Sequence, residues 1–493
     1  MSVAWSTRIP LLAAVVAVSF VPHVAVAAVD IAIGDLSGIT TVAHDGTYPG
    51  GAAAFSMPSV ACNVGTEPIP YRAPMDEAHP VLVMQLYRQL DGRFEQVGVS
   101  DARHEYFALS SSACAACRNP TDGTTLGVDC STTSGTGINA DRNLLGPRAE
   151  VDPYVGRWNC LGSHFAGGEP DCVRRHDGSN HGPLDHRLVA RDEDLGLSGA
   201  EYYYEMYFVT EGDVDKLNNL GSRPCTMFWT GSAWVVQTPS AQTMQSGPAL
   251  ARWGGTQAWA TVPADGSVLL ASKAIDLGNG RNRFEYALFN LDSNRRIGRL
   301  SIPVGSTDVQ AIGFHDPDDD AANDWTVTLT DGVLTWETDP ADVDPNGPGL
   351  LYGVQYNFWF EADVVPAQGE ATLEAWERTG DDETFAAAVV PSAPTDAPEG
   401  ASALLRFSVS PNPLTASTEL SFVLPETGPA SLAIYDAAGR AVRSLLEGTS
   451  EAGVQRVVWD GRDDAARRVE SGVYYGRLTT SSGTSVRSVI VAR

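Results

Sequence analysis

Lysine is almost absent from this chain of 493 residues, and its basic side chains are too few to balance its acidic ones. Lys216 and Lys273 are the only lysines, so nearly all of the 33 basic residues are arginines, against 61 aspartates and glutamates. The formal net charge is −28. Generic binding to nucleic acid or to an anionic membrane needs a basic face, and this charge therefore argues against both.

Long apolar runs are equally scarce, and the first 27 residues hold the longest. Arg8 supplies a positive start, Leu11–Val21 an apolar core, and Ala25 and Ala27 the small residues before a cleavage site. This order is typical of a secretory signal peptide, and the run is short for a bilayer-spanning helix. We therefore expect an exported protein, secreted or at the cell surface, without membrane insertion.

The usual catalytic motifs are missing as well. The sequence has no G-x-S-x-G elbow, no H-E-x-x-H, no P-loop and no G-x-G-x-x-G. It therefore names no reaction, and whether the protein is an enzyme stays open. We expect a non-catalytic binding or structural role. The alternative is a secreted polysaccharide-active hydrolase whose acid and base are dispersed among the many carboxylates, where sequence cannot locate them.

Cysteine occurs only in the N-terminal half, at positions 62, 114, 117, 130, 160, 172 and 225. In an exported protein disulfides are the default, and an odd count leaves at least one thiol free. Cys160 and Cys172 bracket a glycine-rich loop and are the first expected pair. A zinc site is the alternative for part of this set, because one group has the ligand types and spacing of a Cys3His centre: His104, Cys114, Cys117 and Cys130.

Composition favours an all-β architecture, because glycine and proline are frequent and long helical patterns are few. The run Val81–Leu90 could be a buried strand or a short helix, and the Asp91-Gly92 pair after it favours a strand entering a hairpin. We divide the chain into a signal peptide (1–27), a cysteine-containing β-rich domain (28–245), a β-sandwich domain (246–375), a proline-punctuated linker (376–403) and a C-terminal module (404–493).

The C-terminal module consists of short alternating strands separated by turn signals, the pattern of an immunoglobulin-like sandwich of about seven strands. Its runs SVSPNPL, LAIYDAAGRAVRSL, WDGRDDAARRV and SGVYYGRL resemble the FlgD-type Ig-like module, which overlaps the type A sorting domain of the type IX secretion system. The resemblance covers under a fifth of the chain. It implies a secreted or surface-attached protein whose partner is the secretion machinery, and it implies no reaction.

The body upstream of this module resembles secreted bacterial proteins of unassigned function. The runs GDLSG, GGAAAFS, HPVLVMQLYR and EYALFNLDSNRR carry that resemblance, which brings no catalytic residues with it. The expected partner of such a body is a cell-surface molecule or a glycan. Tryptophans such as Trp229 and Trp234 could stack on sugar if they are exposed, although tryptophans of a β-sandwich more often lie in the core.

Four histidines fall within one glycine- and proline-rich stretch: His164, His176, His181 and His186. Imidazole-rich loops can bind zinc or copper. Their spacing does not place them on one helix face, so histidines on a solvated loop are the alternative.

Calcium is the one cofactor that the sequence suggests. Two aspartate-rich runs have the opening of a calcium-binding loop: Asp316, Asp318 and Asp320, then Asp342, Asp344 and Asn346. Both lack the closing carboxylate, because Val327 and Gly353 occupy the twelfth positions. Aspartate-rich turns between strands are the alternative.

The signal peptide gives a direct prediction. Because Ala25 and Ala27 occupy the small-residue positions that a signal peptidase reads, the mature protein should begin at Ala28. N-terminal sequencing of the exported protein checks this, and an exported chain that keeps residues 1–27 would contradict it.

Overall fold

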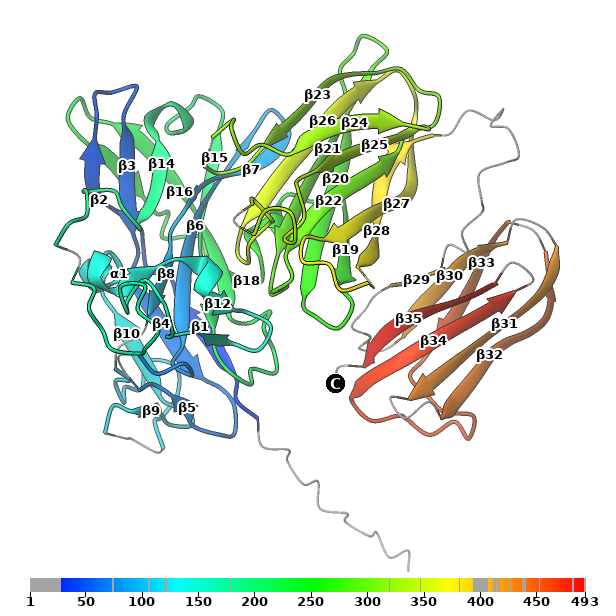
Figure 1. Ribbon diagram of the computed structural model, residues 1–493, viewed down its shortest axis with the longest axis horizontal. Helices are drawn as coiled ribbons and strands as arrows, with labels where there is room; N and C mark the ends of the chain where they lie inside the picture. The colour runs from blue at the N-terminus through cyan, green and yellow to red at the C-terminus, as the bar shows by residue number, and fades with distance from the viewer. Residues whose placement is uncertain are drawn as a thin grey trace, which may run out of the picture.

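The computed structural model describes residues 28–493, except for several short stretches. The excluded stretches are 73–74, 105–106, 119–121, 178, 319, 346, 381, 393–406, 411–413, 415–416, 425–426, 437–439, 452, 481–482 and 492–493. The expected signal peptide (1–27) lies outside the described residues. Strands dominate the described part, which confirms the all-β prediction (Figure 1). Its one α-helix is α1 (Thr136–Asn139).

One large antiparallel sheet forms the N-terminal segment, drawn blue to green in Figure 1, and its main path runs β17-β16-β15-β6-β7-β14-β3-β2. In chain order these strands are β2 (Thr40–Asp45), β3 (Ala52–Ser56), β6 (Val81–Leu90), β7 (Arg93–Val99), β14 (Leu188–Arg191), β15 (Glu201–Val209), β16 (Leu220–Trp229) and β17 (Trp234–Gln237). A smaller sheet of β1 (Ile31–Asp35), β4 (Ser59–Asn63) and β10 (Ser131–Ser134) contributes to the same core. Val81–Leu90 is therefore a strand, and the predicted hairpin leads from it into β7.

Short elements connect these strands. They are β5 (Ile69–Pro70), β8 (Ala102–His104), β9 (Thr125–Leu126), η1 (Arg142–Leu144), β11 (Leu145–Gly146), η2 (Arg148–Glu150), β12 (Val151–Asp152), β13 (Arg157–Trp158), η3 (Asp192–Asp194), β18 (Gln245–Ser246) and η4 (Ala249–Arg252). The candidate site described below lies in the loops between η1 and β14.

A two-sheet sandwich forms the next segment, drawn green to yellow in Figure 1. One sheet runs β19-β20-β21-β26-β23 and the other β24-β25-β22-β27-β28. The bounds are β19 (Thr256–Thr261), β20 (Ser267–Asp276), β21 (Asn282–Asn290), β22 (Ile297–Pro303), β23 (Val309–His315), β24 (Thr326–Thr330), β25 (Val333–Glu337), β26 (Gln355–Ala362), β27 (Pro366–Ala375) and β28 (Glu383–Pro391). Aromatic residues such as Phe284, Trp336 and Phe358 fill the space between the two sheets.

The two body segments share a core. Side chains of a strand alternate between its two faces, so a strand buried on both sides must be apolar throughout. On β6, Leu82 and Leu86 pack into the core of the first segment, whereas Val83 faces the second segment. There it shares a cluster with Leu269 and Phe289 of the sandwich. The two segments therefore pack as one unit.

Polar side chains within this junction are paired across it. The Gln85 and Gln96 amides both donate to the Gly353 carbonyl, at 3.1 and 3.0 Å. The Arg93 guanidinium donates to both Glu285 carboxylate oxygens, at 2.8 and 2.9 Å. Buried polar groups are costly unless they are hydrogen-bonded, so these pairs hold the two sheets in one register.

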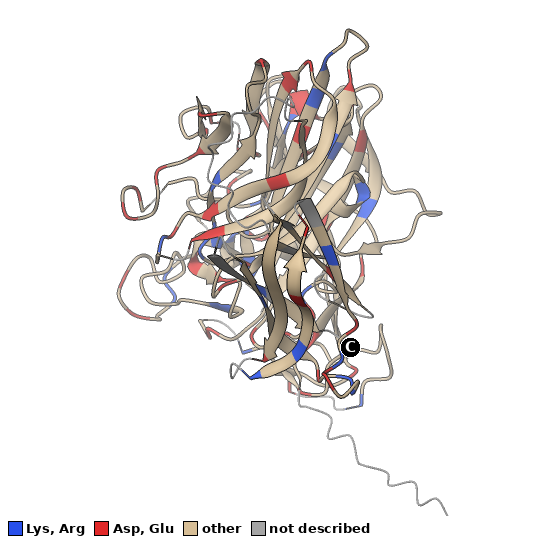
Figure 2. Cartoon of the chain, turned by 90° about the vertical axis from the view of Figure 1, so that its right-hand side faces the viewer, with Lys and Arg blue, Asp and Glu red and all other residues tan. Residues whose placement is uncertain are grey.

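Both lysines contact aromatic rings in the body. Lys216, next to the junction, donates to Asp292 at 2.6 Å and to the Tyr154 carbonyl at 2.7 Å, and it lies 5.3 Å from the centre of the Tyr154 ring. Lys273 lies 4.6 Å from the centre of the Trp253 ring, a cation–π distance. Charged residues of both signs are interspersed along the strands and loops seen in Figure 2.

Three disulfides cross-link the N-terminal segment: Cys62–Cys114, Cys117–Cys130 and Cys160–Cys172. The expected Cys160–Cys172 pair is confirmed. The seventh cysteine, Cys225, is a buried free thiol. Disulfides are typical of exported proteins.

The linker predicted for residues 376–403 begins too early. Trp376 is buried, and Glu383–Pro391 forms β28, which pairs along its whole length with β27. Ala386 and Ala388 of this strand pack into the sandwich core, and such small alternating side chains give only a weak strand signal in sequence. The part of the linker at 393–403 lies outside the described residues.

The described residues of the C-terminal module form a sandwich of seven strands, in agreement with the predicted number of about seven. One sheet is β29-β30-β33 and the other β32-β31-β34-β35. The strands are β29 (Phe407–Ser410), β30 (Thr418–Leu424), β31 (Gly428–Asp436), β32 (Ala441–Ser450), β33 (Gly453–Trp459), β34 (Gly472–Thr480) and β35 (Gly483–Val491). Trp459 and Leu432 are buried between the sheets. Among the described residues no helix is long and apolar enough to span a membrane.

The junction gives a prediction about pH. Glu205 on β15 is fully buried there, it accepts from the Tyr87 hydroxyl at 2.9 Å, and burial raises the pKa of its carboxyl group to about 7. The Glu205 carboxyl group therefore binds its proton more tightly in the folded protein than in the unfolded chain. This tighter binding stabilises the folded protein fully below the ordinary Glu pKa, and the stabilisation is lost as pH rises towards 7. Relative to Glu205→Gln, the wild type should lose up to about 3 kcal/mol of unfolding free energy between about pH 4.5 and about pH 7.5.

Urea unfolding of both proteins at the two pH values measures this difference. Glu201→Gln is the matched control, because Glu201 is an exposed carboxylate on the same strand. A stability difference between the wild type and the Glu205→Gln variant that does not change with pH would contradict the prediction.

Candidate metal centre

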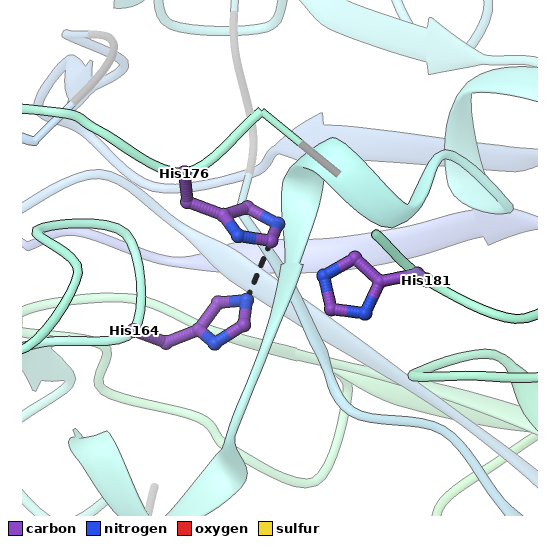
Figure 3. A group of neighbouring side chains, drawn as sticks. All are labelled: His164, His176 and His181. Carbon is purple, nitrogen blue, oxygen red and sulfur yellow. Dashed lines mark hydrogen bonds between the residues drawn. The ribbon is translucent and has the colours of Figure 1, made fainter. Parts of the chain in front are cut away.

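Four histidines that are spread over 23 residues of sequence meet in one place. His164, His176, His181 and His186, here called the histidine cluster, are all partly buried. The ring centres of His164 and His176 are 4.1 Å apart, and those of His181 and His186 are 4.5 Å apart. Figure 3 shows the rings of His164, His176 and His181 converging on a common space.

A cross-linked loop brings His164 and His176 together. The Cys160–Cys172 disulfide closes the loop that carries His164. The chain then runs back along it, and the amides of Arg175 and His176 both donate to the Phe165 carbonyl, at 2.9 and 3.2 Å. These bonds place His176 beside His164 without any regular secondary structure.

Different contacts hold His181 and His186. The Arg142 guanidinium on η1 donates to the carbonyls of His181 and Gly182, at 2.5 and 2.6 Å. His186 precedes β14, and its carbonyl accepts from the Asp101 amide at 3.0 Å. The backbone of His186 has φ +66°, a left-handed conformation that is uncommon for residues other than glycine and is enriched at functional sites.

The distances between ring nitrogens fit a shared metal ion. The Nε2 atoms of His164 and His176 are 3.3 Å apart. With zinc–nitrogen bonds of about 2.0–2.1 Å, two ligands of a tetrahedral site lie about 3.3 Å apart. One nitrogen from each of His164, His176 and His181 lies within 4.8 Å of the other two. The His164–His176 contact is also a long hydrogen bond (dashed in Figure 3), whereas the nitrogens of the buried pair His79 and His104 are 2.9 Å apart, an ordinary hydrogen-bond distance.

The surroundings favour neutral imidazoles in two of these residues. Burial, followed by the neighbouring histidines, lowers the pKa of His164 to about 4. Burial also lowers the pKa of His176. His186 differs, because its hydrogen bond to Asp101 raises its pKa. A neutral imidazole is the form that binds a metal ion.

Two arginines near the cluster would oppose a cation. Arg142 is fixed to the two backbone carbonyls named above, and Arg174 hydrogen-bonds to the Asn143 carbonyl and lies 4.7 Å from the centre of the Phe165 ring. Asp101 and Asp185 supply the opposite charge, with an Asp185 oxygen 3.6 Å from the His181 Nδ1 atom. The cluster therefore has compensating charges close by.

The Cys3His alternative for the cysteines is excluded. Cys114, Cys117 and Cys130 all take part in disulfides, and His104 is buried against Trp158 and Phe165. A second group of potential ligands consists of Glu77, Cys160 and Cys172. It carries no thiolate, because its two cysteines are bonded to each other.

The aspartate-rich runs lie in turns. Asp316 is buried, and burial together with the charge of Asp318 raises its pKa to about 7. Asp320 donates its amide to Asp318 at 2.7 Å, which is turn geometry. In the second run Asp342 and Asp344 are exposed, and Asn346 lies outside the described residues. Calcium binding at either run stays a prediction.

The tryptophans suggested as sugar-stacking residues lie in different environments. Trp234 is 3% exposed, packs in the core of the first segment and donates its indole N–H to Asp192 at 2.7 Å. Trp229 is partly buried and stacks on Tyr48, with the ring centres 4.7 Å apart.

Elsewhere, a cavity of about 390 Å³ next to the junction has Asp215 as the single carboxylate among its described lining residues.

Sequence reasoning found the four histidines but not their convergence. Their spacing does not match one helix face, and the structure joins them instead through a disulfide, backbone hydrogen bonds and the side chain of Arg142. Asp101, which contacts His186 at 2.5 Å, was missed because it lies 85 residues away in sequence. No local pattern in the sequence could have linked the two.

The C-terminal module matches a known family. The model of the FlgD Ig-like domain matches residues 410–484, within the seven-stranded sandwich. The chain therefore carries a FlgD Ig-like domain at its C-terminal end. No curated protein sequence matches the chain.

Three solved structures resemble the chain distantly. Dimeric latent PorU from Porphyromonas gingivalis has 12% identity and a TM-score of 0.19, with 94% of this chain and 34% of PorU covered. The BSP domain of a biofilm associated protein has 9% identity and a TM-score of 0.16, with 94% and 81% covered. PorZ, a surface component of the type-IX secretion system of the same Porphyromonas species, has 11% identity and a TM-score of 0.16, with 92% and 66% covered. This chain thus spans about a third of PorU, and TM-scores this low carry no argument about fold or function.

Proposed function

We propose that the body of this protein binds a transition-metal ion through His164, His176 and His181. The observation that carries the proposal is the convergence of one ring nitrogen from each of these residues within 4.8 Å. Their spacing leaves room for one ion at ordinary metal–nitrogen distances. A fully solvated loop does not require three imidazoles to be partly buried against one another.

The ligand chemistry selects the class of metal. Imidazole nitrogens suit zinc, copper, nickel and iron, whereas calcium and magnesium prefer oxygen ligands. Among divalent ions, affinity for such sites rises to copper and falls again at zinc. The nearby thiols are oxidised, so the site does not depend on cysteine. Zinc and copper are therefore the ions proposed.

The role proposed for the body is binding rather than catalysis. A glycosidase needs two facing carboxylates beside a cleft. The cavity next to the junction offers Asp215 alone among its described lining residues, and the histidine cluster is built mainly from imidazoles. Calcium at the two aspartate-rich runs is a separate and weaker proposal, which rests on their residue types alone.

The C-terminal domain is proposed to deliver this body to the cell surface. The support is the FlgD Ig-like match at 410–484, together with the resemblance of that region to the type A sorting domain of the type IX secretion system. The N-terminal signal sequence would provide the first export step. The partner of this domain would then be the secretion machinery, and the body would act outside the cell, where a glycan or another surface molecule is its expected partner.

Metal binding gives the main prediction. Protein stripped with chelator and then titrated with Zn²⁺ or Cu²⁺ should bind one ion per chain, as measured by calorimetry and elemental analysis. His164→Ala, His176→Ala and His181→Ala should each weaken binding by more than the roughly 10–100-fold that loss of an outer-shell partner costs. Each variant removes a direct ligand, which is the physical reason for the larger effect.

His44→Gln is the matched control, because the His44 ring contacts Asp192 and Trp229 and not the cluster. It should bind metal as the wild type does. If all four variants bind equally, or if the wild type takes up no ion, the site does not bind metal.

Delivery gives a second prediction. Removing residues 404–493 should leave the body folded, because the two body segments share their own core, but should stop its appearance at the cell surface. Surface labelling measures delivery, and near-ultraviolet circular dichroism of the purified truncated protein checks folding. Normal surface amounts of a folded truncated protein would show that the module is not a sorting signal.

A further inference from the structure

We propose that His186 and Asp101 do not bind the metal ion but position the ligand His181. This inference rests on the proposed metal binding and adds a hydrogen-bonded relay behind one of its three ligands. The relay runs from the Asp101 carboxylate through the His186 ring to the Nδ1 atom of His181.

The contacts of the relay are direct. Asp101 Oδ2 lies 2.5 Å from His186 Nδ1. On the other side of the same ring, His186 Nε2 lies 3.2 Å from His181 Nδ1. The His181 nitrogen that remains is Nε2, and in Figure 3 the His181 ring presents a nitrogen to the space shared with His164 and His176.

Along the relay, each hydrogen bond is donated in the same direction, towards Asp101. A carboxylate only accepts, so Nδ1 of His186 must carry a hydrogen and donate it to Asp101. In the neutral form of His186, which predominates at a pH above its raised pKa, Nε2 has a lone pair that accepts from Nδ1–H of His181. His181 is thereby held in the tautomer that keeps the lone pair on Nε2, where a metal ion can bind it. Metal-binding histidines commonly have such an outer-shell acceptor on their second nitrogen.

The backbone holds the relay in place independently of its side chains. Asp101 lies between β7 and β8, and its amide donates to the His186 carbonyl at 3.0 Å. The two residues are thus joined both by main chain and by side chain. The backbone of His186 is left-handed, at φ +66°, and its ring contacts both Asp101 and His181.

A fourth-ligand role for His186 conflicts with this geometry. The nitrogen of His186 that faces the cluster accepts from His181, and the same lone pair cannot also bind a metal ion. The compact group of ligand atoms in the described part of the chain contains His164, His176 and His181 but not His186. Three protein nitrogens leave the fourth position of a tetrahedral site open to water or to a small anion.

The experiment uses Cu²⁺ as the probe on the full-length mature protein. Binding constants come from competition with a chelator, and pulsed electron paramagnetic resonance counts the coordinated imidazoles. Wild type should show three imidazoles. His186→Ala and Asp101→Asn should still show three, but bind about 10–100-fold more weakly. His186→Gln should recover part of the loss, because its amide oxygen can accept from His181 Nδ1–H.

Asp185→Asn is the matched control for charge. Its carboxylate lies 3.6 Å from the same His181 nitrogen but is exposed and outside the relay. The affinity of the Asp185→Asn variant for Cu²⁺ should be within about threefold of that of the wild type if the relay, and not nearby negative charge, sets the affinity. An equal loss in Asp185→Asn and Asp101→Asn would overturn the relay.

Two further outcomes would also overturn it. Four imidazoles in the wild type and three in His186→Ala would make His186 a ligand. Unchanged affinity in both His186→Ala and Asp101→Asn, in folded protein with an unchanged melting temperature, would leave the relay without a role. Failure of the wild type to bind Cu²⁺ at all would instead refute the proposed function, so the two failures are distinguishable.

Discussion

The packing of two sheets face to face governs the rest of this structure. β6 and β15 are buried on both faces, because one face packs in the first segment and the other lies against the sandwich. Such a junction excludes water, so each polar group inside it needs a partner. The pairs Arg93–Glu285 and Gln96–Gly353 supply such partners across the junction. The two segments consequently behave as one body, and the loops that protrude from the first segment are supported by it.

The histidine cluster is connected to this junction through neighbouring residues. Asp101, behind His186, directly follows Ser100. The Ser100 carbonyl accepts from Arg148 Nε at 2.6 Å, and Arg148 also donates to the Tyr352 carbonyl of the second segment at 3.1 Å. The far end of the relay is therefore anchored in the buried junction of the body. Loops that are built without regular secondary structure gain a fixed geometry in this way, which a metal site requires.

Particular elements show how far the sequence could be interpreted. Val81–Leu90 was predicted as a strand because an apolar run before an Asp-Gly turn indicates one side of a hairpin, and it is β6. The alternating runs and turn signals of the C-terminal module predicted an Ig-like sandwich of about seven strands. β28 was missed, because Ala386 and Ala388 carry too little apolar surface to mark a buried face. The cysteines could be assigned to disulfides from their number and from export, but of the three pairs only Cys160–Cys172 was named.

The sequence by itself determined the all-β class and the presence of the C-terminal Ig-like domain, because these depend on composition and on patterns of two to ten neighbouring residues. It favoured disulfides for most cysteines but left a zinc site open as the alternative. Only the tertiary structure decided that four loop histidines converge and that Asp101 lies behind one of them. Convergence of this kind depends on a cross-link, on backbone hydrogen bonds between loops and on strand pairing across long separations. None of these contacts produces a periodic pattern in the sequence. The convergence of the histidines is therefore visible only in the folded structure.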